Sequence, residues 1–442
     1  MTRLARIDIV ATLAAGLFLL GGLGLFLASD AEPATQPGRL PVADIFLGPG
    51  AIGSLDASID SLQQRLRDVP GDWRAAAALG LAYVQQARIT ADPSYYSKAE
   101  GVLRISLERR PRNAEALLGF AALASARHDF DEALRYGERA RELNPYDANT
   151  HGVLGDALVE LGRYEESLAT FQTMVDTRPD TASLARVSYA RELRGDRRGA
   201  ITAMRAARDY AGTPADAAWT SYQLGELYLA EGRLDAAARA FRGGTRLDPG
   251  SIQSFAGRAK VAWARGDLGT AIRQMEEVVG RFPAPEYVIA LGDLHTMAGN
   301  TIPAERQYEL ARVESDLFRA NGVNTDLELA LFHADHGNPV EALTAAKAEW
   351  SRRQSIHVAD ALAWALHVNG QDQQAARYVR RALSLGTPEG LFLYHAGVIE
   401  RALGNRDAAR TFLQRALHVD PWFSILYAAD ARRVLAQLEA GG

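Results

Sequence analysis

The sequence contains no cysteine among its 442 residues. That absence excludes disulfide bonds, thiolate metal sites and a cysteine nucleophile. Positive charge is also in deficit, since 49 lysines and arginines face 54 aspartates and glutamates and leave a formal net charge of −5. Because nucleic-acid-binding surfaces are typically basic, this charge argues against nucleic acid as the main partner.

Motifs for catalysis and cofactor binding are missing as well. No glycine-rich phosphate loop follows a strand pattern, and neither a nucleophile elbow nor a His-Glu-x-x-His run occurs. We therefore expect a protein that is not an enzyme and binds no cofactor. The closest approach to a metal site is His333-Ala-Asp-His336, whose histidines would share one face of a helix. An ordinary core or surface role for both is favoured, with a metal site as the alternative.

What the sequence does have is a repeating helical pattern. The stretch from Tyr222 to Pro249 reads as a helix, a turn at Gly232 and an antiparallel second helix that the proline ends. The turn glycine recurs at steps of 33, 37, 34, 33, 38, 33 and 34 residues, at Gly162, Gly195, Gly232, Gly266, Gly299, Gly337, Gly370 and Gly404. A nearly fixed period of this length predicts a helical solenoid, in which each helix pair needs its neighbours to bury its apolar face.

Small residues recur in the second helix of each unit, where they would let packed helices approach closely. They are Ala133, Ser167, Ala200, Ala237, Ala271, Ala304, Ala342, Ala375 and Ala409. Leu-Gly pairs mark the first helices, at Leu79-Gly80, Leu154-Gly155, Leu224-Gly225 and Leu291-Gly292. Aromatic residues complete the pattern at Tyr83, Tyr228, Phe171 and Phe241.

This combination resembles the tetratricopeptide repeat family. The resemblance implies an all-α, right-handed superhelical solenoid of about ten helix-turn-helix repeats, which would occupy residues 72–423. The family's first-helix tryptophan is absent, and its position is filled by His151, Ser221, Phe255 and Val288. Several sites together define the repeat, so the fold expectation stands without that residue.

The N-terminal region predicts a membrane anchor. Residues 9–28 form an uncharged run of about the length that a bilayer-spanning helix needs. Arginines precede the run and acidic residues follow it, which places residues 1–8 in the cytoplasm and the repeats across the membrane. A cleaved signal peptide, with Ser29-Asp30-Ala31 as its cleavage site, is the alternative. Both interpretations deliver the repeats to the same side.

Two capping helices and a linker complete the predicted organisation. Residues 29–53 hold four prolines and several glycines, which is typical of a linker. Residues 54–71 read as an unpaired helix whose apolar face, Leu55, Ile59, Leu62 and Leu66, would shield the first repeat. Residues 424–442 read as a polar C-terminal cap.

The family resemblance also implies where partners bind. First helices of its members line a concave groove, and transfer of those positions to this sequence gives Tyr189, Trp219, Tyr222, Glu226, Lys260, Trp263, Trp364 and Tyr394. Tyrosine and tryptophan are favoured at recognition surfaces because they combine apolar area with a polar tip. The alternative is that some of these rings fill space between neighbouring helices.

Together these features predict a membrane-anchored, extracytoplasmic scaffold whose partners are other proteins or peptide segments. The membrane contact would be through residues 9–28. The alternative function is an accessory or metal-handling factor of an envelope enzyme or transporter, which would use His333 and His336.

Overall fold

The computed structural model describes residues 52–440. The predicted membrane helix at 9–28 and the linker at 29–53, but for its last two residues, lie outside these residues. Among the helices that are described, none combines the length and the apolar character needed to cross a bilayer.

Residues 52–440 form 22 α-helices and contain no strand. The helices are α2 (Ile52–Asp68), α3 (Trp73–Thr90), α4 (Ser94–Arg109), α5 (Ala114–Ala126), α6 (Phe130–Leu143), α7 (Ala148–Glu160), α8 (Tyr164–Thr177), α9 (Thr181–Leu193), α10 (Arg197–Asp209), α11 (Pro214–Ala230), α12 (Leu234–Leu247), α13 (Ile252–Ala264), α14 (Leu268–Arg281), α15 (Pro285–Met297), α16 (Thr301–Ala320), α17 (Asp326–Asp335), α18 (Pro339–Arg352), α19 (Ile356–Val368), α20 (Asp372–Ala382), α21 (Gly390–Ala402), α22 (Arg406–Val419) and α23 (Tyr427–Ala440).

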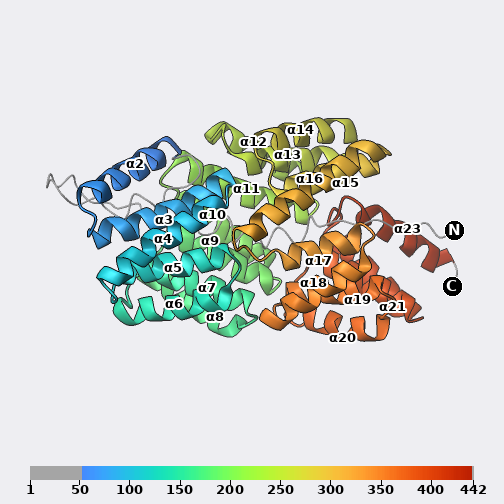
Figure 1. Cartoon of the computed structure of the whole chain (residues 1–442). Helices are drawn as coiled ribbons and strands as arrows, with labels where there is room; N and C mark the ends of the chain where they lie inside the picture. The colour runs from blue at the N-terminus through green and yellow to red at the C-terminus, as the bar shows by residue number, and fades with distance from the viewer. Residues whose placement is uncertain (1–51, 441–442) are drawn as a thin grey trace.

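From α3 to α22 the helices pair into ten antiparallel hairpins that stack side by side, as the sequence period predicts (Figure 1). All eight of the predicted turn glycines have a positive φ, between 69° and 87°. L-residues with a side chain rarely adopt that conformation, which explains why glycine recurs there. The first two hairpins use Ala91 and His128 instead, with φ values of 53° and 58°.

The Leu-Gly pairs have a packing reason. A Cβ atom added at Gly225 would lie 2.3 Å from Cε1 of Phe241, the buried aromatic residue of the second helix of the same hairpin. The same relation holds between Gly155 and Phe171, and between Gly292 and Tyr308. Each glycine therefore provides the space into which the ring of the second helix packs.

We expect Gly225→Ala to lower the free energy of unfolding by about 1–3 kcal/mol, because Phe241 is fully buried and cannot move away from the new methyl group. Gly243→Ala is the matched control, since Gly243 also lies inside a helix but a Cβ there would meet nothing within 4 Å. That change should raise the free energy of unfolding by about 0.5–1 kcal/mol. Urea unfolding of both variants measures the difference, and equal effects would contradict this packing role.

The array does not stay open but closes on itself. Turns inside the early hairpins meet connections between the late hairpins, and the contacting residues lie 191 to 196 positions apart in the sequence. The hydrogen bonds join His128 to Asn324, Tyr164 to Ile356, Leu193 to Thr387, and Arg197 to Pro388. In Figure 1 helices α5–α8 accordingly lie beside α17–α20. Successive turns of the superhelix are thus in direct contact.

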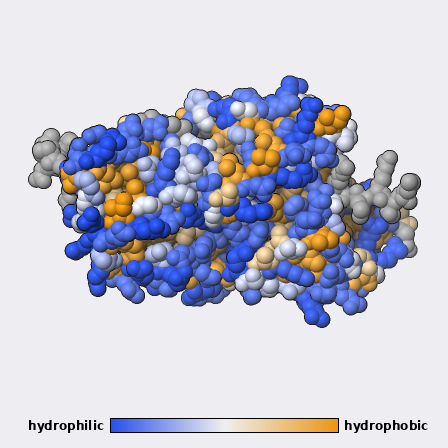
Figure 2. Space-filling view, viewed as in Figure 1, coloured by the Kyte–Doolittle hydropathy of each residue, from blue (hydrophilic) through white to orange (hydrophobic). Residues whose placement is uncertain are grey.

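Helices α2 and α23 flank the hairpins at the two ends. Leu55, Ile59 and Leu62 of α2 are buried in the cluster that also holds residues of α3. The outer surface on the face shown in Figure 2 is mainly hydrophilic, with small separate hydrophobic patches. This surface contrasts with the interior of the closed array, where apolar and polar groups meet around a cavity.

Candidate binding cavity at the centre of the array

A cavity of about 140 Å³ lies where three distant parts of the chain meet. We call it the central cavity, and its lining comes from residues 87–128, 219–253 and 282–328. The three longest helices of the hairpin array, α3, α11 and α16, with 18, 17 and 20 residues, each contribute to the wall. The cavity therefore depends on both the added helix length and the closure of the array.

Aromatic side chains dominate the walls of the central cavity. They are Tyr96, Trp219, Tyr222, Phe282, Tyr287 and Phe318. Tyr96, Tyr222 and Tyr287 are only 2%, 3% and 5% exposed, yet no described residue forms a hydrogen bond with any of their hydroxyl groups. Burial raises the pKa of Tyr96 to about 12 and raises the pKa of Tyr222 and of Tyr287 well above the usual value. These three hydroxyl groups can therefore bond to water or to a molecule in the cavity.

One carboxylate of the wall has no compensating cation. Glu286, at the start of α15, forms no ion pair with any residue of the described chain. The positive charge of Lys260 acts to lower the pKa of Glu286, but Lys260 Nζ forms its ion pair with Glu226 Oε2, at 2.6 Å. Burial, reinforced by the negative charge of Glu328, raises the pKa of Glu286 to about 7.

The predicted groove residues fall into two groups. Trp219 and Tyr222 line the central cavity, while Glu226 and Lys260 pair beside it, between α11 and α13. Tyr189 is buried on α9, and Trp263 packs edge-on against Trp422 with ring centroids 5.7 Å apart. Of the eight residues predicted for the groove, only Trp219 and Tyr222 line this cavity.

Trp364 and Tyr394 fill space between neighbouring helices, which is the alternative that the sequence analysis gave for such rings. Both are 2% exposed and pack between helices of the last repeats. Trp364 stacks on His395 at a centroid distance of 4.2 Å and its Nε1 donates to Asp335. The Tyr394 hydroxyl donates to Asp430 at 2.9 Å. Neither ring contributes surface to the central cavity.

The two histidines considered as metal ligands have different surroundings. His336 follows the end of α17, and its ring nitrogens lie 3.0 Å from Asp293 Oδ1 and 2.7 Å from the Phe332 carbonyl oxygen. His333 Nδ1 lies 3.4 Å from Asn338 Nδ2. Within residues 52–440 no group of three or more histidines and carboxylates is arranged to hold a metal ion.

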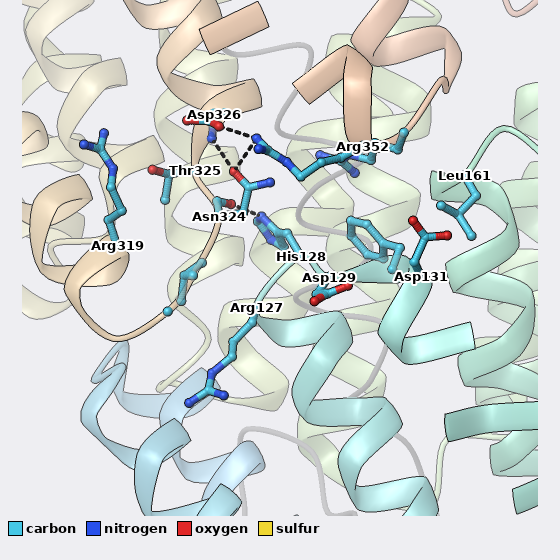
Figure 3. Close-up of a pocket in the computed structure, with 14 residues that line it drawn as sticks. Arg127, His128, Asp129, Asp131, Leu161, Arg319, Asn324, Thr325, Asp326 and Arg352 are labelled. Atoms are coloured by element: carbon cyan, nitrogen blue, oxygen red, sulfur yellow. Dashed lines mark hydrogen bonds and ion pairs between the residues drawn. The ribbon is translucent and has the colours of Figure 1, made fainter. Parts of the chain in front are cut away.

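A second cavity of about 410 Å³ lies at the closing contact itself. Figure 3 shows Arg352, at the end of α18, reaching toward Asn324 and Asp326. Asn324 lies in the loop that follows α16, and Asp326 begins α17. His128 enters from the turn after α5, where its Nδ1 lies 2.7 Å from the Asn324 carbonyl oxygen. Because the polar groups here bond to one another, we interpret this region as part of the closure.

Sequence reasoning missed the cavity residues contributed by other helices, including Tyr96, Glu286, Tyr287 and Phe318. A signal was present for Phe318 alone, because the longest step between turn glycines, 38 residues, contains α16. The added residues of this step lengthen α16, as those of the 37-residue step lengthen α11, and both helices line the central cavity.

Models of the tetratricopeptide repeat family match residues 124–188, 184–252 and 257–315. This matched stretch is built of tetratricopeptide repeats. It includes α11 and α15 and therefore two walls of the central cavity. The hairpins before and after the matched stretch continue the same helical geometry.

Solved tetratricopeptide repeat structures are also similar to this chain. A thermophilic protein of Thermus thermophilus shares 22% identity over 44% of this chain and 98% of its own, with a TM-score of 0.38. A repeat protein of Parabacteroides merdae shares 17% identity over 59% and 98%, with a TM-score of 0.36. Human IFIT1, as a dimer with PPP-AAAA, shares 14% identity over 94% and 96%, with a TM-score of 0.46. No curated protein matches the sequence.

Proposed function

We propose that this protein is a non-enzymatic scaffold whose tetratricopeptide repeats bind a segment of another protein along the inner surface of the array. Tetratricopeptide repeats generally mediate protein–protein interactions, and their stacked first helices create extended binding surfaces. The observation that carries the proposal is the aromatic inner wall at Trp219 and Tyr222, whose indole and phenol rings suit recognition of a peptide.

A photocrosslinking amino acid placed at Gln223 tests this function. Gln223 lies on the cavity wall of α11, so a bound partner segment should be captured there. Gln373 is the matched control, because it is exposed on α20 and does not line the cavity. We expect one partner to crosslink through position 223 and not through 373, in cells that express the full chain.

The crosslinked partner should also respond to the wall itself. Trp219→Ala should lower its yield at position 223 at least several-fold while the helical circular dichroism signal stays the same, since hot-spot rings contribute about 2 kcal/mol or more to binding. A partner captured equally at positions 223 and 373, or insensitive to Trp219→Ala, would argue against binding inside the array.

We further propose that residues 9–28 anchor the protein in the cytoplasmic membrane and that the repeats lie on its outer side. The support is the uncharged run with arginines before it and acidic residues after it. A phosphatase reporter joined after Gly53 is therefore expected to be active, and a cytoplasmic fluorescent reporter at the same position to be dark. The reverse pattern would overturn the orientation.

A further inference from the structure

The central cavity combines three features that suit a cationic ligand. Its walls are aromatic, three of its tyrosine hydroxyl groups form no hydrogen bond within the described chain, and Glu286 forms no ion pair there. Aromatic faces attract cations through the negative charge of their π systems. A carboxylate next to such faces adds charge complementarity, and tyrosine oxygens add acceptors for an N–H group.

We propose that the central cavity binds a small organic ammonium ion, with its nitrogen at Glu286 and its apolar part against the aromatic wall. The ion would share the wall at Trp219 and Tyr222 with the proposed partner segment, and separate measurements test the two proposals. Tyr222 and Tyr287 line the cavity together with Glu286, and Tyr287 follows Glu286 directly in the sequence. The ion would thereby gain a charge partner and aromatic faces at once.

The other charged groups of the wall leave this preference intact. Glu328 is a second carboxylate, and His128 Nδ1 lies 4.0 Å from Glu328 Oε1. Arg88 is the one arginine of the wall, but it comes from α3 and its electrostatic neighbours are Tyr96, Arg186 and Asp156 rather than Glu286. With the histidine neutral, the lining carries one positive and two negative formal charges.

The size of the cavity limits the ligand to about one ring. An engineered cavity of about 150 Å³ holds a benzene molecule, and the central cavity measures about 140 Å³. A monocation with one ring or a short alkyl body fits this volume, and a partner segment would place only a single side chain in it.

Isothermal titration calorimetry of the full chain tests the site with three probes of one shape: benzylammonium, neutral benzyl alcohol and anionic benzoate. We expect benzylammonium to bind at least tenfold more tightly than benzyl alcohol, and benzoate not to bind. Glu286→Gln keeps the shape of the side chain but removes its charge, so it should abolish the tenfold preference and leave benzyl alcohol binding unchanged.

Glu142→Gln is the control, since Glu142 is exposed on α6 and does not line the cavity. This variant should bind benzylammonium like the wild type. Glu328→Gln provides a second variant and should weaken benzylammonium binding two- to fivefold.

Equal binding of benzylammonium and benzyl alcohol by the wild type would overturn the proposal. So would unchanged benzylammonium binding in Glu286→Gln, or no binding of benzylammonium to the wild type at millimolar concentration. None of these results concerns partner capture at Gln223.

Discussion

Arg353→Ala is expected to lower the free energy of unfolding by about 3–5 kcal/mol and to open the array. Arg353 follows α18 and forms ion pairs with Glu160, at the end of α7, and with Glu349. All three side chains are at most 4% exposed. Glu160 and Arg353 lie 193 residues apart, so this pair joins the early hairpins to the late ones.

The large effect comes from the carboxylate that is left behind. Burial already raises the pKa of Glu160 above its usual value, against the opposing effect of Arg353. Without Arg353 a buried negative charge has lost its ion-pair partner, and separation of the two superhelical turns would bring that charge into water.

Urea unfolding and small-angle X-ray scattering of the full chain measure the two consequences. We expect a lower unfolding midpoint together with a larger radius of gyration. Arg410→Ala is the control because its ion pair with Asp407 is exposed, and it should change stability by at most about 1 kcal/mol. A compact Arg353→Ala protein with wild-type stability would show that the pair does not hold the array closed.

Arg186→Ala is the second variant with a large expected effect, again about 3–5 kcal/mol of lost stability. Arg186 on α9 donates two hydrogen bonds to Asp156 on α7, at 2.9 and 2.6 Å, and both side chains are buried. This bidentate pair links neighbouring hairpins rather than distant ones. The variant should therefore unfold more readily without the expansion expected for Arg353→Ala.

The pH dependence of the Arg186 variant follows from the same pair. Burial raises the pKa of Asp156 above its ordinary 3.8, while Arg186 acts to lower it. Removal of Arg186 raises the folded-state pKa further, so between the two folded-state values the folded variant retains a proton that the folded wild type has released. The stability difference from wild type should therefore grow as pH rises through that range, which lies above 3.8, and stay constant below it. A difference that does not change with pH would contradict an uncompensated Asp156.

Much of the fold could be predicted because each repeat contains its own local signals. Positive φ at the turn requires glycine at Gly232, and the ring of Phe241 requires a glycine at position 225. Such constraints act within one hairpin, so they recur with the period of the chain. Eight of the ten hairpins have the turn glycine.

The cavity could be predicted only in part, because closure depends on contacts that have no local pattern. Trp219 and Tyr222 were found from their repeat positions, but Tyr96 and Phe318 join them only when turns about 190 residues apart meet. A single repeat gives no measure of the superhelix's pitch. For the same reason Trp364 and Tyr394 occupy groove positions in the repeat yet lie buried between helices.

Closure of the array is the claim on which the cavity depends, and the absence of native cysteines allows a direct test. Arg194 and Leu385 line one small pocket between the turn after α9 and the connection after α20. In the full chain with Arg194→Cys and Leu385→Cys, a short bismaleimide should form an intramolecular crosslink between these two positions, identified by mass spectrometry. If each cysteine instead reacts with a separate bismaleimide molecule and no crosslinked peptide is found, the closed array is contradicted.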